Sequence, residues 1–139
     1  AEKINFFYRG SNLSHDLIFL SATFKGEKQD GKKIREKMNK LSSDKKKSQP
    51  SRIKTCGSTF KNPINKMQKK AWELIKEAKC EKMKIGDALI SEKHCNFFIN
   101  KGSATSADME NLINLVREKV LRTTGIKLEL ELQIIGDKE

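Results

Sequence analysis

The residues of the chain that can do chemistry on their own are three cysteines and two histidines. Cys56, Cys80 and Cys95 lie 24 and 15 residues apart, and His15 and His94 are far from each other in the sequence. A structural zinc site needs four nitrogen or sulfur ligands in close-set pairs, and the chain contains no CxxC pair. Adjacent strand residues point to opposite faces, which argues against His94 and Cys95 as a base and nucleophile. We therefore expect no metal site, and reduced thiols that mostly fill the core.

Apolar and polar side chains alternate from residue 126 to residue 134, which predicts a strand with one face on the core. The other face holds two carboxylates and an ammonium group. Such a face usually borders water and in some proteins forms the wall of an active site, and periodicity alone favours water. The apolar set is Ile126, Leu128, Leu130, Leu132 and Ile134, and the polar set is Lys127, Glu129, Glu131 and Gln133.

The positive charge of the chain is concentrated in one stretch. The formal net charge is +11, and residues 25–54 contribute 12 basic and 4 acidic side chains to it. Phe24 is the one aromatic residue near this stretch, so the pattern of basic and aromatic residues that stacks on bases is missing. We interpret the stretch as a solvated basic helix followed by a lysine-rich loop. A nucleic-acid or ribosome-associated binding module remains the alternative.

The composition is that of a folded protein. The 139 residues are 36% hydrophobic and 34% charged, which allows one domain with a core of modest size. No apolar run approaches the roughly 20 residues that span a bilayer, and the first ten residues lack the apolar centre of a signal peptide. We therefore expect a cytoplasmic protein that does not enter membranes.

Four further segments have the length and composition of strands, and three have apolar residues at helical spacing. Asp30 and Ser106 are the expected N-caps of the first and last helix. Residues 42–51 contain no apolar side chain and predict a mobile loop. These elements predict an α+β fold with a small mixed β-sheet and two principal helices. The strands are residues 17–24, 52–56, 85–90 and 95–100, and the helices are residues 32–41, 65–79 and 106–125.

Four separated blocks, taken together and in this order, resemble a known family. They are YRGS at 8–11, CGSTFKNP at 56–63, SEKHCNFFINKGSATSAD at 91–108 and LELELQIIG at 128–136. The combination resembles the C-terminal part of the UDP-N-acetylenolpyruvoylglucosamine reductases, the FAD- and NADPH-dependent enzymes of peptidoglycan precursor synthesis. Before residue 51 the resemblance rests mainly on the YR-x-S pattern.

The resemblance implies a boundary near residue 50. Residues 1–50 would be the end of the second FAD-binding domain with the basic helix and loop, and residues 51–139 the substrate-binding domain. The family's N-terminal half carries a glycine-rich stretch that wraps the FAD pyrophosphate, and these residues contain no such stretch. We expect this chain alone to retain neither FAD nor NADPH and to be inactive without the N-terminal FAD domain, and we assign none of its residues to cofactor binding.

The resemblance also implies three catalytic residues for the conversion of UDP-N-acetylenolpyruvoylglucosamine to UDP-N-acetylmuramate. In the family, a hydride is added to the enolpyruvyl group and the neighbouring carbon is then protonated. Ser58 falls at the position of the proton donor. Arg9 would be the fixed cation that binds the substrate carboxylate, with Glu131 beside it. From the residues alone, these are a turn serine, a surface arginine and a solvent-facing strand glutamate.

Tyr8, Asn62 and His94 are the substrate-binding residues that the resemblance implies. Asn62 and His94 would contact the diphosphate or the sugar, with Lys61 and Lys93 as possible helpers. Amide, imidazole and ammonium donors suit a diphosphate. An asparagine before a proline can equally form a turn, and a histidine can equally be structural, so both interpretations stay open.

Overall fold

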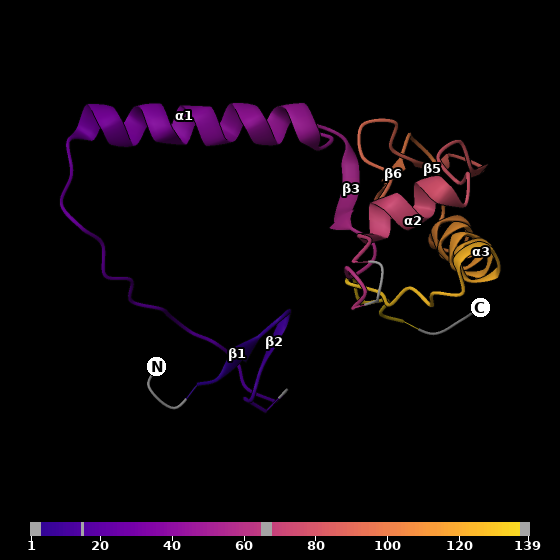
Figure 1. Ribbon diagram of the computed structural model, residues 1–139, viewed down its shortest axis with the longest axis horizontal. Coiled ribbons are helices and arrows are strands. Elements are labelled where there is room, and N and C mark those ends of the chain that lie inside the picture. Colours follow the sequence, from indigo (N-terminus) through magenta and orange to yellow (C-terminus); the bar gives the residue numbers. More distant parts are fainter. Residues whose placement is uncertain (1–3, 15, 65–67, 137–139) are drawn as a thin grey trace. The chain divides into compact units, whose positions relative to one another are not determined.

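The computed structural model describes residues 4–14, 16–64 and 68–136 (Figure 1). The chain divides into two units, Ala1–Ile34 and Arg35–Glu139, which are called the N-terminal unit and the C-terminal unit. Each is described by itself. No helix in the described ranges is long and apolar enough to cross a membrane.

The N-terminal unit contains a small hairpin. Strands β1 (Phe6–Phe7) and β2 (Gly10–Ser11) pair antiparallel, with Phe6 opposite Ser11 and Phe7 opposite Gly10. Tyr8 and Arg9 form the two-residue turn, and Arg9 has a φ of 58°, in the left-handed region that most side chains avoid. The backbone of Arg9 is therefore in a costly conformation that the hairpin must hold in place.

Residues 17–24 do not form the strand that their composition predicts. The segment has no secondary structure, and Ile18, Phe19 and Leu20 are 85, 72 and 92% exposed. A strand needs a neighbour that accepts its backbone hydrogen bonds. No described residue takes that place, so the strand prediction is wrong for this structure.

Helix α1 (Gly31–Ser48) is longer than the sequence predicts. Asp30 caps it as expected, with its side-chain Oδ1 accepting from the Lys32 N–H at 2.9 Å. The mobile loop expected for residues 42–51 is wrong up to Ser48, which is helical. The stretch has no helix breaker before Pro50, and Lys45, Lys46 and Lys47 lie in the last turn, where the helix dipole favours cations. The lack of apolar side chains in residues 42–48 leaves this part of the helix exposed, but it does not prevent the helix from forming.

The C-terminal unit is built on a four-stranded sheet of order β3-β6-β5-β4. Every pairing in it is antiparallel, whereas the sequence analysis expects a mixed sheet. The expected strand at 85–90 is a hairpin, with Gly86 in its turn at a φ of 53°. The strands are β3 (Lys54–Ser58), β4 (Lys84–Ile85), β5 (Ala88–Ile90) and β6 (Phe97–Asn100).

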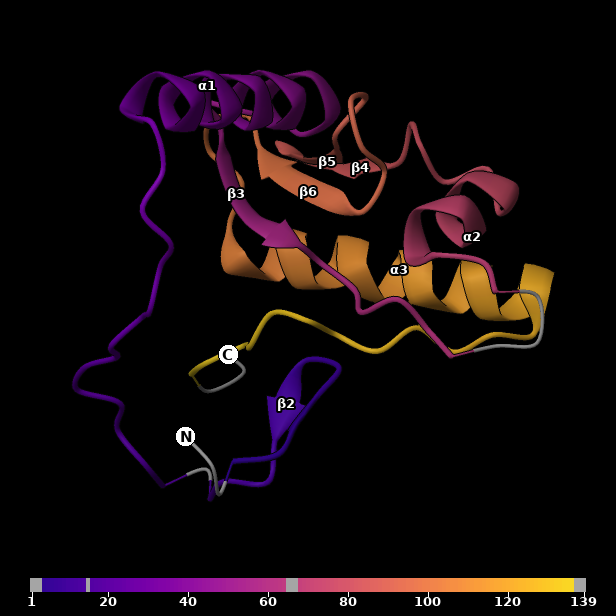
Figure 2. The same cartoon turned by 60° about the vertical axis from the view of Figure 1, so that its left-hand side comes forward.

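Helix α3 packs on this sheet and lies across one of its faces, and helix α2 packs on α3 (Figure 2). Helix α2 is Ala71–Glu77, shorter than the predicted 65–79, of which residues 65–67 lie outside the described residues. Helix α3 is Ser106–Thr124 and ends at Gly125 as predicted, with a φ of 71°. Its N-cap is Thr105 and not Ser106, because the Thr105 side chain accepts from the Asp108 N–H. The α+β fold expected from the sequence is confirmed.

The core lies between the helices and the sheet. Its fully buried members come from every layer, and Phe60 and Phe98 meet edge to face with ring centroids 5.8 Å apart. Each large side chain buried in this way stabilises the fold by roughly 1.5–3 kcal/mol. The largest are Phe60, Leu74, Ile75, Ile90, Leu112, Ile113, Val116, Val120 and Leu128.

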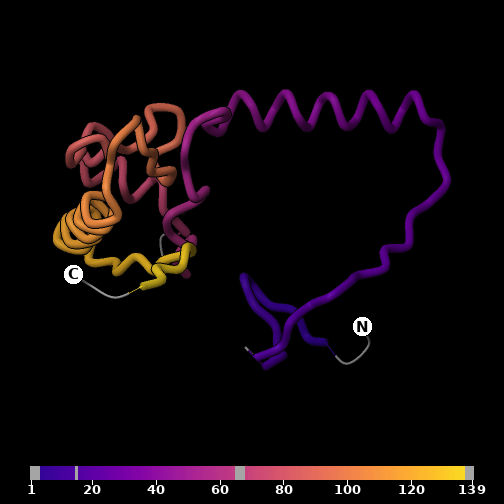
Figure 3. Tube along the Cα trace, turned by 180° about the vertical axis from the view of Figure 1, so that it is seen from behind, coloured from indigo at the N-terminus to yellow at the C-terminus, as the bar shows by residue number. Residues whose placement is uncertain are grey.

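The C-terminal segment, residues 126–136, returns from the end of α3 to residues 59–61 (Figure 3). It forms a single antiparallel bridge, between Leu130 and Phe60, in place of the long strand expected. Pro63, which has no N–H, ends the pairing on one side, and Gly57, at a φ of 84°, ends it on the other. The alternation is confirmed in part, because Leu128 is buried and Glu129 is exposed.

Candidate active site

Ser58 stands at the last position of β3, directly after a kink in the strand. It lies opposite Phe97 of β6, and the register shifts between Thr55 and Ser58. Gly57 enables the shift, since its φ of 84° is costly for any residue with a side chain. Bulges of this kind re-aim the side chain that follows and are common beside active sites. Ser58 is half-buried. It is the last residue of a bulged strand, whereas the residues alone suggest a serine in a turn.

Asn96 holds the backbone that follows Ser58. Its Oδ1 accepts from the Phe60 N–H at 3.0 Å, and its Nδ2 donates to the Phe60 carbonyl at 2.8 Å. Its own carbonyl accepts from the Thr59 N–H at 2.8 Å. Asn96 is 5% exposed, so these bonds are shielded from water. The sequence analysis missed this residue, and its one signal is a polar side chain directly before the apolar run of β6.

Glu131 reaches the same place from the other end of the chain. Its backbone N–H donates to the Thr59 carbonyl at 2.9 Å, next to Ser58 in the sequence. The Lys61 N–H donates to the Glu129 carbonyl at the same distance. Glu131 is half-buried, whereas Glu129 is exposed. The structure thus places the main chains of Ser58 and Glu131 on neighbouring extended segments, as the resemblance implies for two residues of one site.

Asn62 connects this region to helix α2. Its Oδ1 accepts from the Ala71 N–H at 3.1 Å, which is the first N–H of α2. The N-terminal N–H groups of a helix have no partner within the helix, so this bond stabilises the start of α2. Asn62 therefore has the structural role that the sequence left open. A contact with substrate would come from its amide donors.

His94 lies beside the aromatic residues of α2 and β6. Its ring is 4.9 Å from the Phe97 ring and 6.5 Å from the Trp72 ring, both edge to face. The Asn96 N–H donates to its Nδ1 at 3.2 Å. Burial lowers the pKa of His94 below its usual 6.5, because the charged form is less well solvated there. A neutral ring whose Nδ1 accepts carries its proton on Nε2, so His94 is a neutral donor at pH 7.

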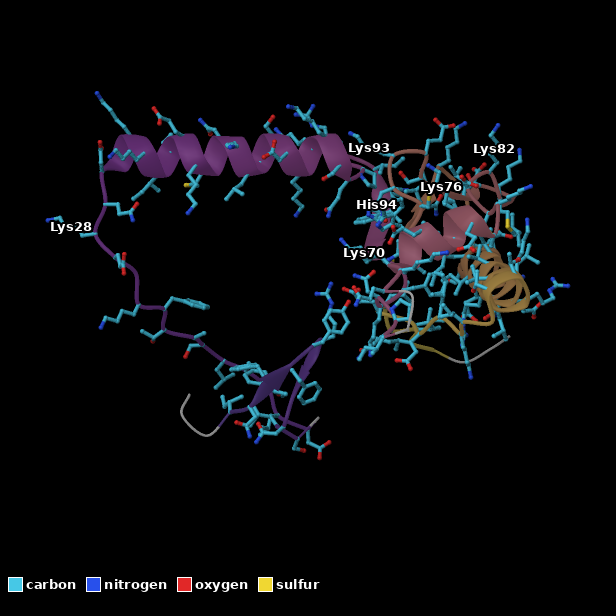
Figure 4. The ribbon with its side chains drawn as sticks, viewed as in Figure 1. Lys28, Lys70, Lys76, Lys82, Lys93 and His94 are labelled. Carbon is cyan, nitrogen blue, oxygen red and sulfur yellow. The ribbon has the colours of Figure 1, made fainter. Side chains whose placement is uncertain are left out.

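Several lysines surround His94 in sequence and in space. Figure 4 labels Lys70 and Lys76 on or next to α2 and Lys93 before β6, in the same part of the C-terminal unit. Burial raises the pKa of the nearby Cys95 thiol, the charge of Glu81 raises it further, and the charge of Lys76 has a smaller, opposite effect. Lys93 donates from its Nζ to the Lys46 carbonyl of α1.

Tyr8 and Arg9 belong to the N-terminal unit. The Arg9 guanidinium lies over the Tyr8 ring, 5.6 Å from its centroid, in a cation–π contact. The structure brings these two together. In the C-terminal unit Glu131 bonds to Thr59, the residue after Ser58, and His94 accepts from Asn96, whereas Asn62 bonds to Ala71. The joint site of all six therefore stays a prediction.

The hollow at the start of α3 does not suit a flavin pyrophosphate. An open hollow of about 410 Å³ lies at the start of α3, lined by Lys54, Thr55 and Asn100 among others. The Asp108 carboxylate already accepts from the Thr105 N–H there, at 2.9 Å, and these bonds lower the pKa of Asp108. An ionised carboxylate at that helix end repels a diphosphate. The described part of the chain also contains no group of three side chains that could hold a metal ion.

Residues 49–135 match the family model "UDP-N-acetylenolpyruvoylglucosamine reductase, C-terminal domain". The chain belongs to this family. The match begins at residue 49, five residues before β3. The division that the resemblance implies lies near residue 50.

Individual members of the family extend the match to nearly the whole chain. UDP-N-acetylenolpyruvoylglucosamine reductases of Pelagibacter ubique and Rickettsia typhi are 49 and 47% identical over 135 residues, which is 97% of this chain and 45% of each relative. The crystal structure of the reductase from Thermus caldophilus is 32% identical, with a TM-score of 0.78, and the match covers 95% of this chain and 46% of that one. The chain thus spans about half the length of the relatives it matches.

Proposed function

We propose that this chain is the C-terminal, substrate-binding part of an FAD- and NADPH-dependent reductase that converts UDP-N-acetylenolpyruvoylglucosamine to UDP-N-acetylmuramate. The observation that carries the proposal is the meeting of three family blocks at Thr59 and Phe60. Ser58 precedes this dipeptide, Asn96 clamps it, and Glu131 bonds to it. The proposal includes the cytoplasmic location expected from the sequence, and a division near residue 50.

In this proposal, Ser58 donates the proton that completes the reduction of the enolpyruvyl group. A hydroxyl is a weak acid, so its proton must be delivered from a fixed position. The Gly57 bulge and the Asn96 clamp support that role, because they fix the backbone on both sides of Ser58. Arg9 and Glu131 would hold the substrate carboxylate, on which charge develops during the reaction.

The diphosphate and sugar of the substrate would lie near His94. A neutral imidazole donor can bind a diphosphate without the cost of burying a second charge. Asn62 at the start of α2 and Tyr8 would complete the substrate contacts. FAD and NADPH would be held by the part of the relatives' length that lies outside this match, since the sequence contains no glycine-rich stretch for the FAD pyrophosphate.

The proposal is tested with a fusion protein in which the part of the Pelagibacter ubique reductase that precedes the match is joined to this chain. Without oxygen, we expect the fusion protein to oxidise NADPH beyond one equivalent per flavin only when UDP-N-acetylenolpyruvoylglucosamine is present, and to form UDP-N-acetylmuramate. UDP-N-acetylglucosamine, which lacks the enolpyruvyl group, is the matched control substrate. Oxidation of NADPH with the enolpyruvyl substrate but without formation of UDP-N-acetylmuramate would refute the assignment.

This chain alone offers a second test through its single tryptophan. Trp72 lies 6.5 Å from the His94 ring, so its fluorescence should report a ligand bound there. We expect UDP-N-acetylglucosamine to change the emission in a saturable way and uridine, which lacks the diphosphate, to have no effect. Equal responses to both would contradict the placement of the diphosphate at His94.

A further inference from the structure

Asn96 lies where the main chain of β6 stops pairing with the segment that follows β3. The ladder between the two strands ends at the pair Ser58 and Phe97. One further main-chain bond joins the Thr59 N–H to the Asn96 carbonyl, at 2.8 Å. Before Asn96 the chain forms a turn, in which the Phe97 N–H donates to the His94 carbonyl at 2.9 Å. The main chain next to Asn96 is therefore a turn and not a continuation of the strand.

The Asn96 side chain extends the ladder in place of a peptide group. Its Oδ1 accepts from the Phe60 N–H at 3.0 Å, and its Nδ2 donates to the Phe60 carbonyl at 2.8 Å. These are the two bonds that a directly opposite residue of an antiparallel strand forms with its own main chain. Because the side chain forms them, the main-chain N–H of Asn96 donates elsewhere, to the His94 Nδ1 at 3.2 Å. One residue thus serves two parts of the candidate site with different atoms.

The two residues that Asn96 holds also bond to the C-terminal segment. The Thr59 carbonyl accepts from the Glu131 N–H at 2.9 Å, and Ser58 directly precedes Thr59. Thr59 and Phe60 are 1 and 0% exposed, so water does not replace a bond that is lost there. A shift of this dipeptide therefore displaces Ser58 and Glu131 together.

The hydrogen bonds of Asn96 use its side-chain donor and acceptor and both of its main-chain groups. A buried polar group costs free energy when it is unpaired, and a fully paired one holds a single arrangement. An apolar side chain at this position would pack without a preferred direction. A group that transfers a proton needs a fixed position, because a displacement of about an ångström costs up to roughly 100-fold in rate. The directional bonds of Asn96 are suited to that requirement.

We propose that the Asn96 side chain positions the Ser58 hydroxyl for proton transfer, and that its main-chain N–H independently orients the His94 ring. The inference rests on the proposed function, in which Ser58 protonates the carbon next to the one that accepts the hydride. The carbon–hydrogen bond forms as the Oγ–H bond of Ser58 breaks, and water then returns a proton to Oγ. Removal of the side chain leaves the main-chain N–H in place, so it should impair proton transfer and spare binding at His94.

Asn96→Ala in the fusion protein described above is the first test. In rapid mixing without oxygen, the rate constant of the step with the enolpyruvyl substrate should fall by roughly 10- to 100-fold, as expected for a displaced donor. The rate constant of the step that consumes NADPH should stay the same. The substrate concentration that half-saturates the enolpyruvyl step should also stay the same, because the bond to His94 remains. Equal slowing of both steps would overturn the proposal.

Asn100→Ala is the matched control at the far end of β6 from Ser58. The Asn100 Oδ1 accepts from the Gly102 and Ala104 N–H groups, at 2.9 and 3.1 Å. Its Nδ2 donates to the Ala104 carbonyl at 2.9 Å, so the same kind of side chain holds main-chain groups of another loop. Asn100→Ala should lower the melting temperature and leave the rate constants of both steps unchanged. If it slows the enolpyruvyl step as much as Asn96→Ala does, the effect is one of stability and the proposal is wrong.

Deuterium oxide distinguishes a misplaced proton donor from partial unfolding. In Asn96→Ala the solvent isotope effect on the enolpyruvyl step should exceed that of the unsubstituted fusion protein, because proton transfer then limits the step. Partial unfolding would lower the amplitude of both steps and leave the isotope effect unchanged, which would contradict the proposal. If Asn96→Ala does not fold, Asn96→Asp should show the same slowing and isotope effect, since it keeps the shape of the side chain but lacks the amide donor.

The outcomes separate this inference from the proposed function. A fusion protein that forms UDP-N-acetylmuramate equally fast with Asn96→Ala and Asn100→Ala keeps the function and refutes the positioning role. A fusion protein that forms no product refutes both, because Ser58 then has no proton to deliver to this substrate. Hydrogen exchange in this chain alone tests the positioning without any reaction: the Glu131 amide should exchange faster in Asn96→Ala than in Asn100→Ala. Equal exchange would refute the positioning by itself.

Discussion

Residues 17–24 and residues 126–132 are both apolar enough to be strands, and they differ completely in burial. Leu128 is fully buried in the core, and Leu20 is 92% exposed. The C-terminal segment finds its partner in residues 59–61 of the same unit, whereas residues 18–24 find none among the described residues. A segment with the composition of a strand therefore has only a tendency to form one. Whether the strand forms depends on a neighbouring segment that pairs with its backbone.

The same contrast extends to the two long helices. Helix α3 buries Leu112, Ile113, Val116 and Val120 against the sheet and α2, and helix α1 buries nothing. Their lengths are nearly equal, at 19 and 18 residues. Helix α1 depends on its cap and on residues that favour a helix, while α3 adds tertiary packing. Substitutions at the buried positions after residue 53 should therefore change the stability of this chain, and substitutions before residue 49 should change it little.

Replacing one phenylalanine in each region gives the largest expected difference. Phe60→Ala removes a fully buried side chain and should lower the free energy of unfolding by about 3–5 kcal/mol. Phe19→Ala removes a side chain that is 72% exposed and should change it by less than about 0.5 kcal/mol. Urea denaturation of this chain measures both. If Phe60→Ala does not fold, Phe60→Leu should still unfold at a lower urea concentration than Phe19→Leu, and equal midpoints would break the comparison.

The second-largest expected effect is on the reaction rate, and it comes from a substitution in the C-terminal unit. In the fusion protein Ser58→Ala should slow the step with the enolpyruvyl substrate by on the order of 10²-fold or more, the usual worth of a positioned acid. The step that consumes NADPH should keep its rate. Ser43→Ala in the exposed face of α1 is the matched control and should change neither. Rapid mixing separates the two steps, and equal slowing of both by Ser58→Ala would indicate a structural serine.

Much of the C-terminal unit is predictable because its local pattern and its packing agree. The apolar positions of α3 have helical spacing and are buried, and Gly125 ends the helix as its freedom at positive φ predicts. The helical residues 42–48 were missed because the absence of apolar side chains speaks to burial and not to helicity. The sequence does not predict the hairpin within 85–90, because Gly86 is the only residue that indicates its turn.

At the candidate site, local sequence patterns do not predict every important contact. The resemblance implies Ser58, Asn62, His94 and Glu131, and the structure shows a bond of Asn62 to Ala71, of His94 to Asn96 and of Glu131 to Thr59. Asn96 has no periodic or charge signal, since its importance comes from Phe60, which is 36 residues away in the sequence. Contacts over such a distance arise from the packing of the whole unit.

Removal of the Asn96 amide should have a smaller effect than the loss of the Phe60 ring. Asn96→Ala leaves the N–H and carbonyl of the buried Phe60 without partners, which should cost about 2 kcal/mol of unfolding free energy. Asn39→Ala on the exposed α1 is the matched control and should change it by less than about 0.5 kcal/mol. The amide of Phe60 should also exchange faster in Asn96→Ala. Unchanged exchange at Phe60 would show that Asn96 is not the clamp.

The smallest expected effect is the pH dependence that His94 adds to the stability of the C-terminal unit. Its pKa is lowered in the folded chain by burial, so the unfolded chain binds the proton more tightly. The free energy of unfolding should therefore fall as the pH drops below about 6.5 and level off below the folded pKa, with a slope of at most about 1.4 kcal/mol per pH unit. His94→Gln should lose this part of the slope. Trp72 fluorescence gives the folded pKa directly, since a protonated ring 6.5 Å away quenches the indole. A midpoint above 6.5 would mean that burial does not disfavour the cation, and that His94 meets the diphosphate as a charged group.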